Sequence, residues 1–88
     1  MKSEASSSFW KTHEKLNKEL QILAKQKYEI WKVNSNHPSL QFKCVNAKKN
    51  IWSIRISESH RAIGIRPDHD YILWFWIGDH DTYMKLIS

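Results

Sequence analysis

The stretch WSIRISESHRAIGI, residues 52–65, consists of two apolar runs that flank a short polar turn. In the first run, Trp52, Ile54 and Ile56 alternate with Ser53 and Arg55. Apolar and polar side chains that alternate with a period of two predict a half-buried β-strand. The polar segment at 58–60 is too short for a crossover connection. We therefore expect the second run, RAIGIR at 61–66, to return as an antiparallel neighbour of the first.

Two further strands are expected beside this hairpin. LQFKCV at 40–45 alternates Leu40, Phe42 and Cys44 against the residues between them. YILWFWI at 71–77 is apolar at every position, as expected of a central strand that is covered on both faces. NAKKN at 46–50 and PDHD at 67–70 are short turns. The second half of the chain therefore predicts an antiparallel meander of four strands.

The first half of the chain has the period of helices. One of the serines at 6–8 can cap a helix that opens at Phe9, and Asn17 is the expected break before a second helix that ends near Val33. The apolar residues of this second helix recur at helical spacing; they are Leu20, Leu23, Ala24, Tyr28 and Trp31. Residues 1–8 are polar and are expected to form an arm or an extra N-terminal edge strand. Residues 78–88 are expected to close the chain as one helical turn.

These elements predict an α+β fold, with two N-terminal helices packed on a four-stranded antiparallel sheet. Two helices can cover only one broad face of such a sheet. The other face carries Lys43, Ser53 and Arg55, and we expect it to be open to solvent or to a ligand.

Length and composition place further bounds on the protein. With 88 residues, we expect one domain over 1–88. No apolar run is long enough to span a membrane and the start has no apolar signal-peptide core, so a cytoplasmic protein without a membrane partner is expected. Cys44 is the one cysteine. The sequences at 68–70 and 79–81 each place a histidine between two aspartates, a common surface pattern, so neither a metal nor another cofactor is expected.

The net charge of +5 with neutral histidines is consistent with an acidic partner, such as nucleic acid, or with a chain that is merely lysine-rich. Seven of the eleven lysines lie within residues 1–32, whereas Arg55, Arg61 and Arg66 all lie in the strand region. A guanidinium group donates two parallel hydrogen bonds to a phosphate, so arginine in a sheet favours phosphate binding.

Three segments of the chain together resemble one known family. HPSLQFK at 37–43, WSIRISESHRAIGI at 52–65 and WFWIGDHDTYMKLI at 74–87 are similar, in order and spacing, to the RelE/ParE superfamily of bacterial toxins. The resemblance extends from Phe9 to the C-terminus. It implies a RelE-like fold and the toxin of a type II toxin–antitoxin module, with a cognate antitoxin as partner. Members such as RelE, YoeB and HigB cleave mRNA on the ribosome, so the ribosome and mRNA are implied partners.

The same resemblance implies a set of functional residues. Arg55, Arg61, His80 and Tyr83 match catalytic positions of the RNA-cleaving members. The RNA-binding positions fall on Lys43, Lys48 and Lys49. This chain departs from the family in two ways. YoeB-like members carry a glutamate in the segment that corresponds to residues 37–50, which contains no acid here. RelE-like members have more lysines and arginines than this chain. ParE-like members keep the fold and inhibit DNA gyrase, so a non-catalytic gyrase inhibitor or an inactive antitoxin-binding member are the alternatives.

Each of these residues also has an ordinary structural interpretation. Strict alternation places Arg61 with Ile63 and Ile65, so only a twist or bulge after Ser59 is expected to bring it beside Arg55; otherwise it forms a buried ion pair with Glu58 or Asp79. On the same structural interpretation, His80 is an ordinary surface residue and Tyr83 is a packing anchor. The five tryptophans are expected mostly in the core, with Trp74 or Trp76 as the better candidates for a base-stacking surface.

Overall fold

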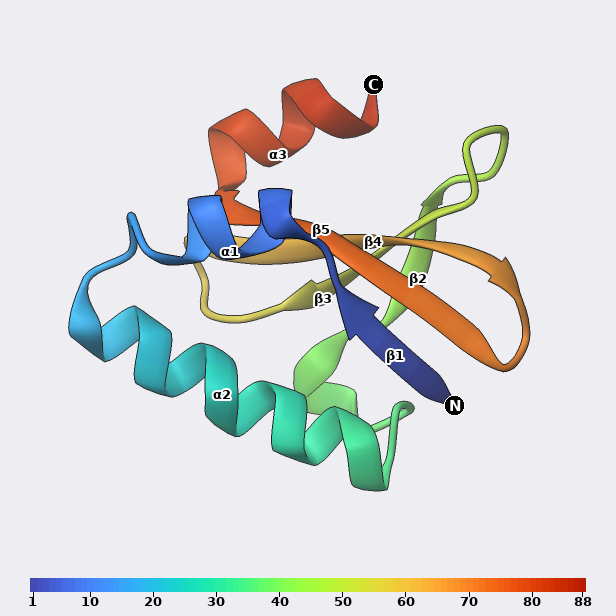
Figure 1. The fold of residues 1–88 in the computed structure, drawn as a ribbon, viewed down its shortest axis with the longest axis horizontal. Coiled ribbons are helices and arrows are strands. Elements are labelled where there is room, and N and C mark those ends of the chain that lie inside the picture. Colours follow the sequence, from blue (N-terminus) through green and yellow to red (C-terminus); the bar gives the residue numbers. More distant parts are fainter.

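The computed structural model describes residues 1–88, and its centre is a five-stranded sheet in the order β1-β5-β4-β3-β2 (Figure 1). The strands are β1 (Lys2–Ala5), β2 (Lys43–Asn46), β3 (Ile51–Arg55), β4 (His60–Asp68) and β5 (Tyr71–Asp79). The antiparallel meander of four strands, β2 to β5, is confirmed. The N-terminal edge strand is confirmed as well, and it pairs in parallel with β5. The fold class is therefore α+β, as predicted.

Three α-helices accompany the sheet: α1 (Ser7–His13), α2 (Lys18–Val33) and α3 (His80–Ile87). The side chain of Ser6 accepts a hydrogen bond from the backbone N–H of Phe9, and the side chain of Asn17 accepts one from Leu20. These caps satisfy backbone donors that a helix leaves free at its start. The predicted break at Asn17 is confirmed. α3 is longer than the single turn that the sequence predicts.

The segment before β2 differs from the prediction of a strand over 40–45. Leu40 ends a short 3₁₀ helix, η1 (Pro38–Leu40), and β2 begins only at Lys43. Proline at the first position of η1 has the fixed φ that a helix start requires, and Gln41 follows in a left-handed conformation with φ 46°. Local turn chemistry at residues 37–41 therefore overrides the alternation of Leu40, Phe42 and Cys44.

Both faces of the sheet are covered, one by α2 and one in part by α3 (Figure 1). We name them the α2 face and the α3 face. The α2 face carries the larger core, which contains Ala24, Trp31, Leu40, Ile54, Ile56, Ala62, Ile72, Trp74 and Ile77. The α3 face carries a smaller core of Ile51, Ile63 and Tyr83. The expectation of one open face is wrong because α3 packs on it, and Ser53 is buried there at 2% exposure.

α1 completes the outer edge of β5. The pairing of β1 with β5 ends at Ala5, and the hydroxyl of Ser8 then donates to the carbonyl of Phe75 at 2.9 Å. The hydroxyl of Thr12 accepts from the backbone N–H of Ile77 at 3.1 Å. These bonds satisfy backbone groups that an unpaired strand edge leaves open. None of the helices combines the length and the apolar character that crossing a membrane requires.

Candidate functional site

Two arginines lie directly opposite each other on the α3 face. Arg55 of β3 pairs in register with Arg61 of β4, and side chains at opposite positions of an antiparallel pair lie on the same face. The one ion pair of the structure joins Lys32 to Glu29, so neither guanidinium has a carboxylate partner. Like charges at opposite positions repel each other. Two uncompensated guanidinium groups at one position of the sheet therefore form a site that an anion would stabilise.

This placement corrects the prediction for Arg61. Strict alternation does put Arg61 with Ile63, but Ile63 is buried on the α3 face beside Tyr83 rather than under α2. Arg61 therefore lies beside Arg55 without a bulge between them. The alternative of an ion pair with an acid is also wrong. The Nη1 atom of Arg61 donates instead to backbone carbonyls of the β3–β4 turn; these are Ser57 at 2.6 Å, His60 at 3.0 Å and Glu58 at 3.3 Å.

The two arginines therefore differ in their freedom. Arg61 is held by the turn, so its position is fixed while its charge remains uncompensated. Arg55 is half-buried and its side chain makes no hydrogen bond within the protein. The guanidinium of Arg55 is therefore free to bind nonbridging phosphate oxygens, and the fixed charge of Arg61 lies beside it.

A third cation lies on the same face. Lys43 of β2 pairs in register with Ser53, so its side chain lies on the α3 face, one strand further from Arg61 than Arg55 is. Lys48 and Lys49 do not join this group. They lie in the exposed β2–β3 turn, and the extended residues of β3 separate that turn from Arg55 by about 13 Å.

α3 brings the predicted histidine and tyrosine to the same face. The backbone N–H of His80 donates to the carbonyl of Ser59 at 2.9 Å, so His80 begins α3 beside the β3–β4 turn that Arg61 also holds. The imidazole is exposed, and its centre is 5.5 Å from that of the Tyr83 ring. The two residues are three apart in α3, so the helix places both rings on one side.

Tyr83 is itself a core residue. Its side chain is 5% exposed, and its hydroxyl bonds the hydroxyl of Ser53 at 3.3 Å. A buried phenol has no free face for stacking on a base, so the packing interpretation of Tyr83 is confirmed. Ser53 is the one polar side chain in the buried core, and reading the sequence did not single it out. The signal was a serine between two apolar residues, Trp52 and Ile54, where a buried hydroxyl requires a partner.

Asp79, the acid that begins α3 next to His80, is already engaged. The Oδ1 atom of Asp79 accepts from the backbone N–H of Thr82 at 2.8 Å, and its Oδ2 accepts from the Thr82 hydroxyl at 3.0 Å. These two hydrogen bonds, with a smaller contribution from the charge of His60, lower the pKa of the Asp79 carboxyl. Asp79 is therefore the ionised cap of α3, and each of its oxygens accepts a hydrogen bond from Thr82.

Trp76 is an aromatic side chain of the α3 face. It lies two residues before Gly78, which pairs in register with Arg61. A Cβ on Gly78 would lie 2.5 Å from Cζ2 of Trp76, so the indole rests against the glycine backbone. Trp76 is half-buried and Trp74 is buried under α2, at 4% exposure. Of the two predicted stacking candidates, only Trp76 shares a face with the arginines.

The remaining arginine and the main hollow of the molecule lie on the α2 face. The guanidinium carbon of Arg66 is 4.5 Å from the centre of the Trp52 ring and 5.6 Å from that of Phe42. A cleft of about 650 Å³ lies between α1, α2 and the sheet, and none of Arg55, Arg61 and His80 lines it. Arg55, Arg61 and Lys43 thus lie on the α3 face, whereas this cleft opens on the α2 face.

The fold is similar to that of several solved toxin structures. The toxin in the RelB–RelE antitoxin–toxin complex from Methanococcus jannaschii has a TM-score of 0.70 at 16% identity, covering 96% of this chain and 98% of its own. A YoeB/ParE toxin from Agrobacterium tumefaciens has a TM-score of 0.69 at 15% identity, covering 91% of this chain and 99% of its own. YafQ from Escherichia coli has a TM-score of 0.66 at 14% identity, covering 93% of this chain and 96% of its own. No family model and no curated protein sequence matches the chain. At these identities the likeness establishes architecture, and the chain has the RelE-like fold of these toxins.

Proposed function

We propose that this protein is the toxin of a type II toxin–antitoxin system, and that it acts in the cytoplasm as a ribosome-dependent mRNA endonuclease. The RelE-like fold and the complex of one structural neighbour with an antitoxin support the toxin role. The observation that carries the nuclease proposal is the uncompensated pair Arg55–Arg61, on the same face as Lys43 and at the same end of the sheet as His80. An RNA phosphate supplies the negative charge that this position lacks.

The proposed reaction is cleavage by the neighbouring 2′-hydroxyl. The 2′-oxygen forms a bond to phosphorus, the bond from phosphorus to the 5′-oxygen breaks, and negative charge accumulates on the nonbridging oxygens in between. Arg55 donates to those oxygens, and Arg61 adds a second positive charge from a fixed position. A preorganised cation is effective because it does not reorient during the reaction.

His80 is the proposed group for proton transfer. The 2′-hydroxyl must lose a proton and the 5′-oxygen must gain one, and an exposed imidazole can do either near neutral pH. Solvent carries the other transfer. Tyr83 serves as the packed base on which the His80 ring rests, rather than as a reacting group.

Lys48 and Lys49, which lie away from the arginines, are proposed to contact ribosomal RNA phosphates. Each phosphate contact releases counterions from the RNA, so the affinity of the protein for the ribosome should fall steeply as the salt concentration rises. Replacing both lysines with alanine should lower that salt dependence and leave the cleavage position unchanged.

In vitro translation tests this proposal. Wild-type protein should cut mRNA at the ribosomal A site, seen as new 5′ ends. Arg55→Gln should abolish cutting, and His80→Ala should slow it by about a hundredfold or more, the usual contribution of a proton-transfer group. Lys15→Gln removes one exposed cation outside the site and should cut normally. Circular dichroism verifies that each variant is folded.

A gyrase inhibitor with the same fold is the second candidate, and a specific observation favours it. Residues 37–50 contain no acid where YoeB-like members carry a glutamate, and both oxygens of Asp79 accept hydrogen bonds in the cap of α3. Intact mRNA together with blocked DNA supercoiling would establish this alternative. If neither effect occurs, the protein is an inactive member that only binds an antitoxin.

A further inference from the structure

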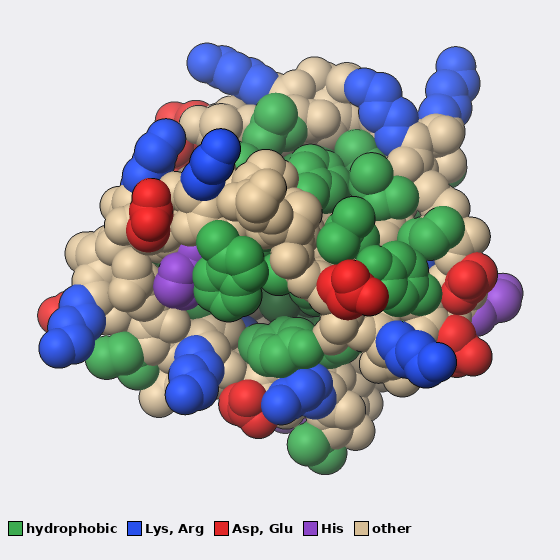
Figure 2. Space-filling view, in the orientation of Figure 1, with side chains coloured by type: hydrophobic (Ala, Val, Ile, Leu, Met, Phe, Trp, Pro, Cys, Tyr) green, Lys and Arg blue, Asp and Glu red, His purple; other side chains and the backbone are tan.

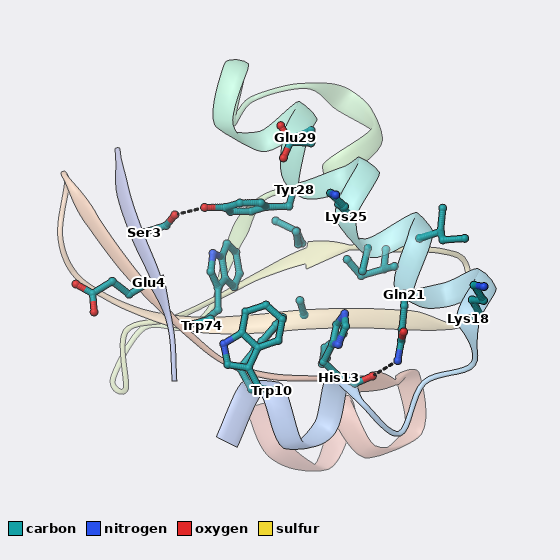
Figure 3. Close-up of a pocket in the computed structure, with 18 residues that line it drawn as sticks. Ser3, Glu4, Trp10, His13, Lys18, Gln21, Lys25, Tyr28, Glu29 and Trp74 are labelled. Atoms are coloured by element: carbon teal, nitrogen blue, oxygen red, sulfur yellow. Dashed lines mark hydrogen bonds between the residues drawn. The ribbon is translucent and has the colours of Figure 1, made fainter. Parts of the chain in front are cut away.

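A second hollow, of about 420 Å³, lies between the β2–β3 turn and the β4–β5 turn. Figure 1 shows both turns at the end of the sheet opposite to the start of α3. The hollow is lined by Asn50, Trp52, Arg66, Pro67, Asp68 and His69, and we name it the Arg66 pocket. It shares no residue with the larger cleft on the α2 face, which Figure 2 shows among hydrophobic side chains and Figure 3 draws with the residues that line it.

Two aromatic rings lie against one side of the Arg66 guanidinium. Its carbon atom is 4.5 Å from the centre of the Trp52 ring and 5.6 Å from that of Phe42. The two ring centres are 5.0 Å apart. A group inserted between two rings would hold their centres about 7 Å apart, twice the usual contact distance between carbon atoms. The guanidinium therefore lies over both rings rather than between them, and its other flat face is turned away from them.

Hydrogen bonds hold this guanidinium in place without neutralising its charge. The Nη2 atom of Arg66 donates to the carbonyl of His69 at 3.1 Å, and the backbone N–H of Arg66 donates to the carbonyl of Asn50 at 3.0 Å. The Nε atom is buried and has no acceptor. A buried donor without a partner costs free energy, so the stability of the fold alone does not favour this placement. Such costs are typical of residues that serve binding.

An acid lines the same pocket but does not pair with the arginine. The Oδ1 atom of Asp68 accepts from the backbone N–H of Asp70 at 2.8 Å, and this bond holds the carboxylate in the β4–β5 turn. No ion pair joins Asp68 to Arg66. The pocket therefore offers one ligand both a flat cation and a separate anionic acceptor.

We propose that the Arg66 pocket binds a single nucleotide, whose base stacks on the open face of the Arg66 guanidinium. Nucleic-acid bases stack on arginine as they do on aromatic rings, and here Trp52 and Phe42 support the guanidinium from its other side. The carboxylate of Asp68 accepts from an exocyclic amino group of the base. The pocket therefore favours cytosine over uracil, which has an oxygen in place of that amino group.

Two lysines beside the pocket suit the phosphate of the nucleotide. Lys48 and Lys49 are exposed in the β2–β3 turn, directly before Asn50, and neither forms an ion pair. The same chemistry fits a free mononucleotide and one nucleotide of a single-stranded RNA. The inference rests on the proposed function only for identifying that RNA as ribosomal.

Nuclear magnetic resonance titration of nitrogen-15-labelled protein at low salt tests the pocket. CMP should shift the side-chain Nε–H signal of Arg66 and the indole N–H signal of Trp52, and it should bind about fivefold more tightly than UMP. Inorganic phosphate cannot stack and should leave the Trp52 signal in place. The trinucleotide CpCpC distinguishes the two sources. Affinity about tenfold above that of CMP, falling steeply with salt, indicates RNA, and affinity no greater than that of CMP indicates a free nucleotide.

Matched variants show which groups are responsible. Arg66→Lys keeps the charge but loses the flat face, so it should weaken CMP binding about tenfold. It also removes the Nε–H that has no acceptor, so the fold should be retained. Asp68→Asn should remove the preference for CMP, because an amide can accept from cytosine or donate to uracil. Arg55→Gln lies on the α3 face, outside the pocket, and should bind CMP as wild type does.

Three results would overturn the proposal: no shift of the Arg66 signal with CMP, equal affinity for CMP and UMP, or loss of CMP binding in Arg55→Gln. Inorganic phosphate that shifts the Trp52 signal as strongly as CMP would overturn it in favour of a simple anion site. If CMP binds as expected but wild-type protein cuts no mRNA during translation, the nuclease proposal fails and this one stands. If wild-type protein cuts mRNA but CMP does not bind at Arg66, the nuclease proposal stands and this one fails.

Discussion

Replacing Arg55 with glutamine should stabilise the fold while abolishing the proposed activity. The guanidinium groups of Arg55 and Arg61 start from directly opposite positions and have no carboxylate between them. Two unit charges about 6 Å apart in a water-like dielectric repel each other by about 0.7 kcal/mol, and like-charged pairs on a sheet destabilise it by a similar amount. Glutamine retains much of the side-chain stem, so the gain is expected to be about 0.5–1 kcal/mol.

Urea denaturation measures this gain. With an m value of about 1 kcal/mol/M for a chain of this size, the midpoint should rise by about 0.5–1 M. Salt screens repulsion, so the gain should shrink when ionic strength increases from about 0.02 M to about 0.5 M. Lys15→Gln lowers the net charge equally, but Lys15 lies exposed between α1 and α2, and it should show a much smaller gain. If Arg55→Gln is no more stable than Lys15→Gln, or its gain does not depend on salt, the two arginines do not repel each other.

Three further measurements examine the fold around the site. Gly64→Ala should destabilise the protein by about 1–3 kcal/mol in urea, because the new Cβ would lie 2.9 Å from the carbonyl oxygen of Leu73, which is backbone and cannot move aside. Thr12→Val should cost about 1–2 kcal/mol, because it leaves the N–H of Ile77 without its acceptor; an unchanged midpoint would mean that α1 does not hold β5. For Asp79 the pKa is lowered by the hydrogen bonds of the α3 cap, so its ionised form stabilises the native state above about pH 4. The stability difference between wild type and Asp79→Ala should therefore narrow as pH falls below about 4, and a constant difference would contradict this account.

The helices and strands were largely predictable from local patterns. Asn17 as the cap of α2, the end of that helix at Val33 and the alternation in β3 all depend on neighbouring residues, whose backbone preferences and side-chain period are written in the sequence itself. The segment before β2 was an exception of the same local kind. There Pro38 and a left-handed Gln41 replaced the expected strand with a turn of 3₁₀ helix.

The candidate site was predictable in its residues but not in its arrangement. Arg55, Arg61, Lys43 and His80 were identified from resemblance, and the structure places all of them on or beside the α3 face. Tyr83 was identified too, yet its burial against a serine was not foreseen. Exposure depends on which distant side chains pack against a residue, and no local pattern contains that information.

Apart from η1, the sequence alone determined the kind of each element and their order, because the period of apolar residues and the turn chemistry act within a few residues. Only the tertiary structure decided which residues of the sheet pack against α2 and which pack against α3. Ile54 and Ile63 are equally apolar and lie on neighbouring strands, but one packs under α2 and the other under α3. The distinction depends on where α2 and α3 pack on the two faces of the sheet. The register of β3 and β4 places Arg61 beside Arg55 on the α3 face, and the cleft beneath α2 lies on the other.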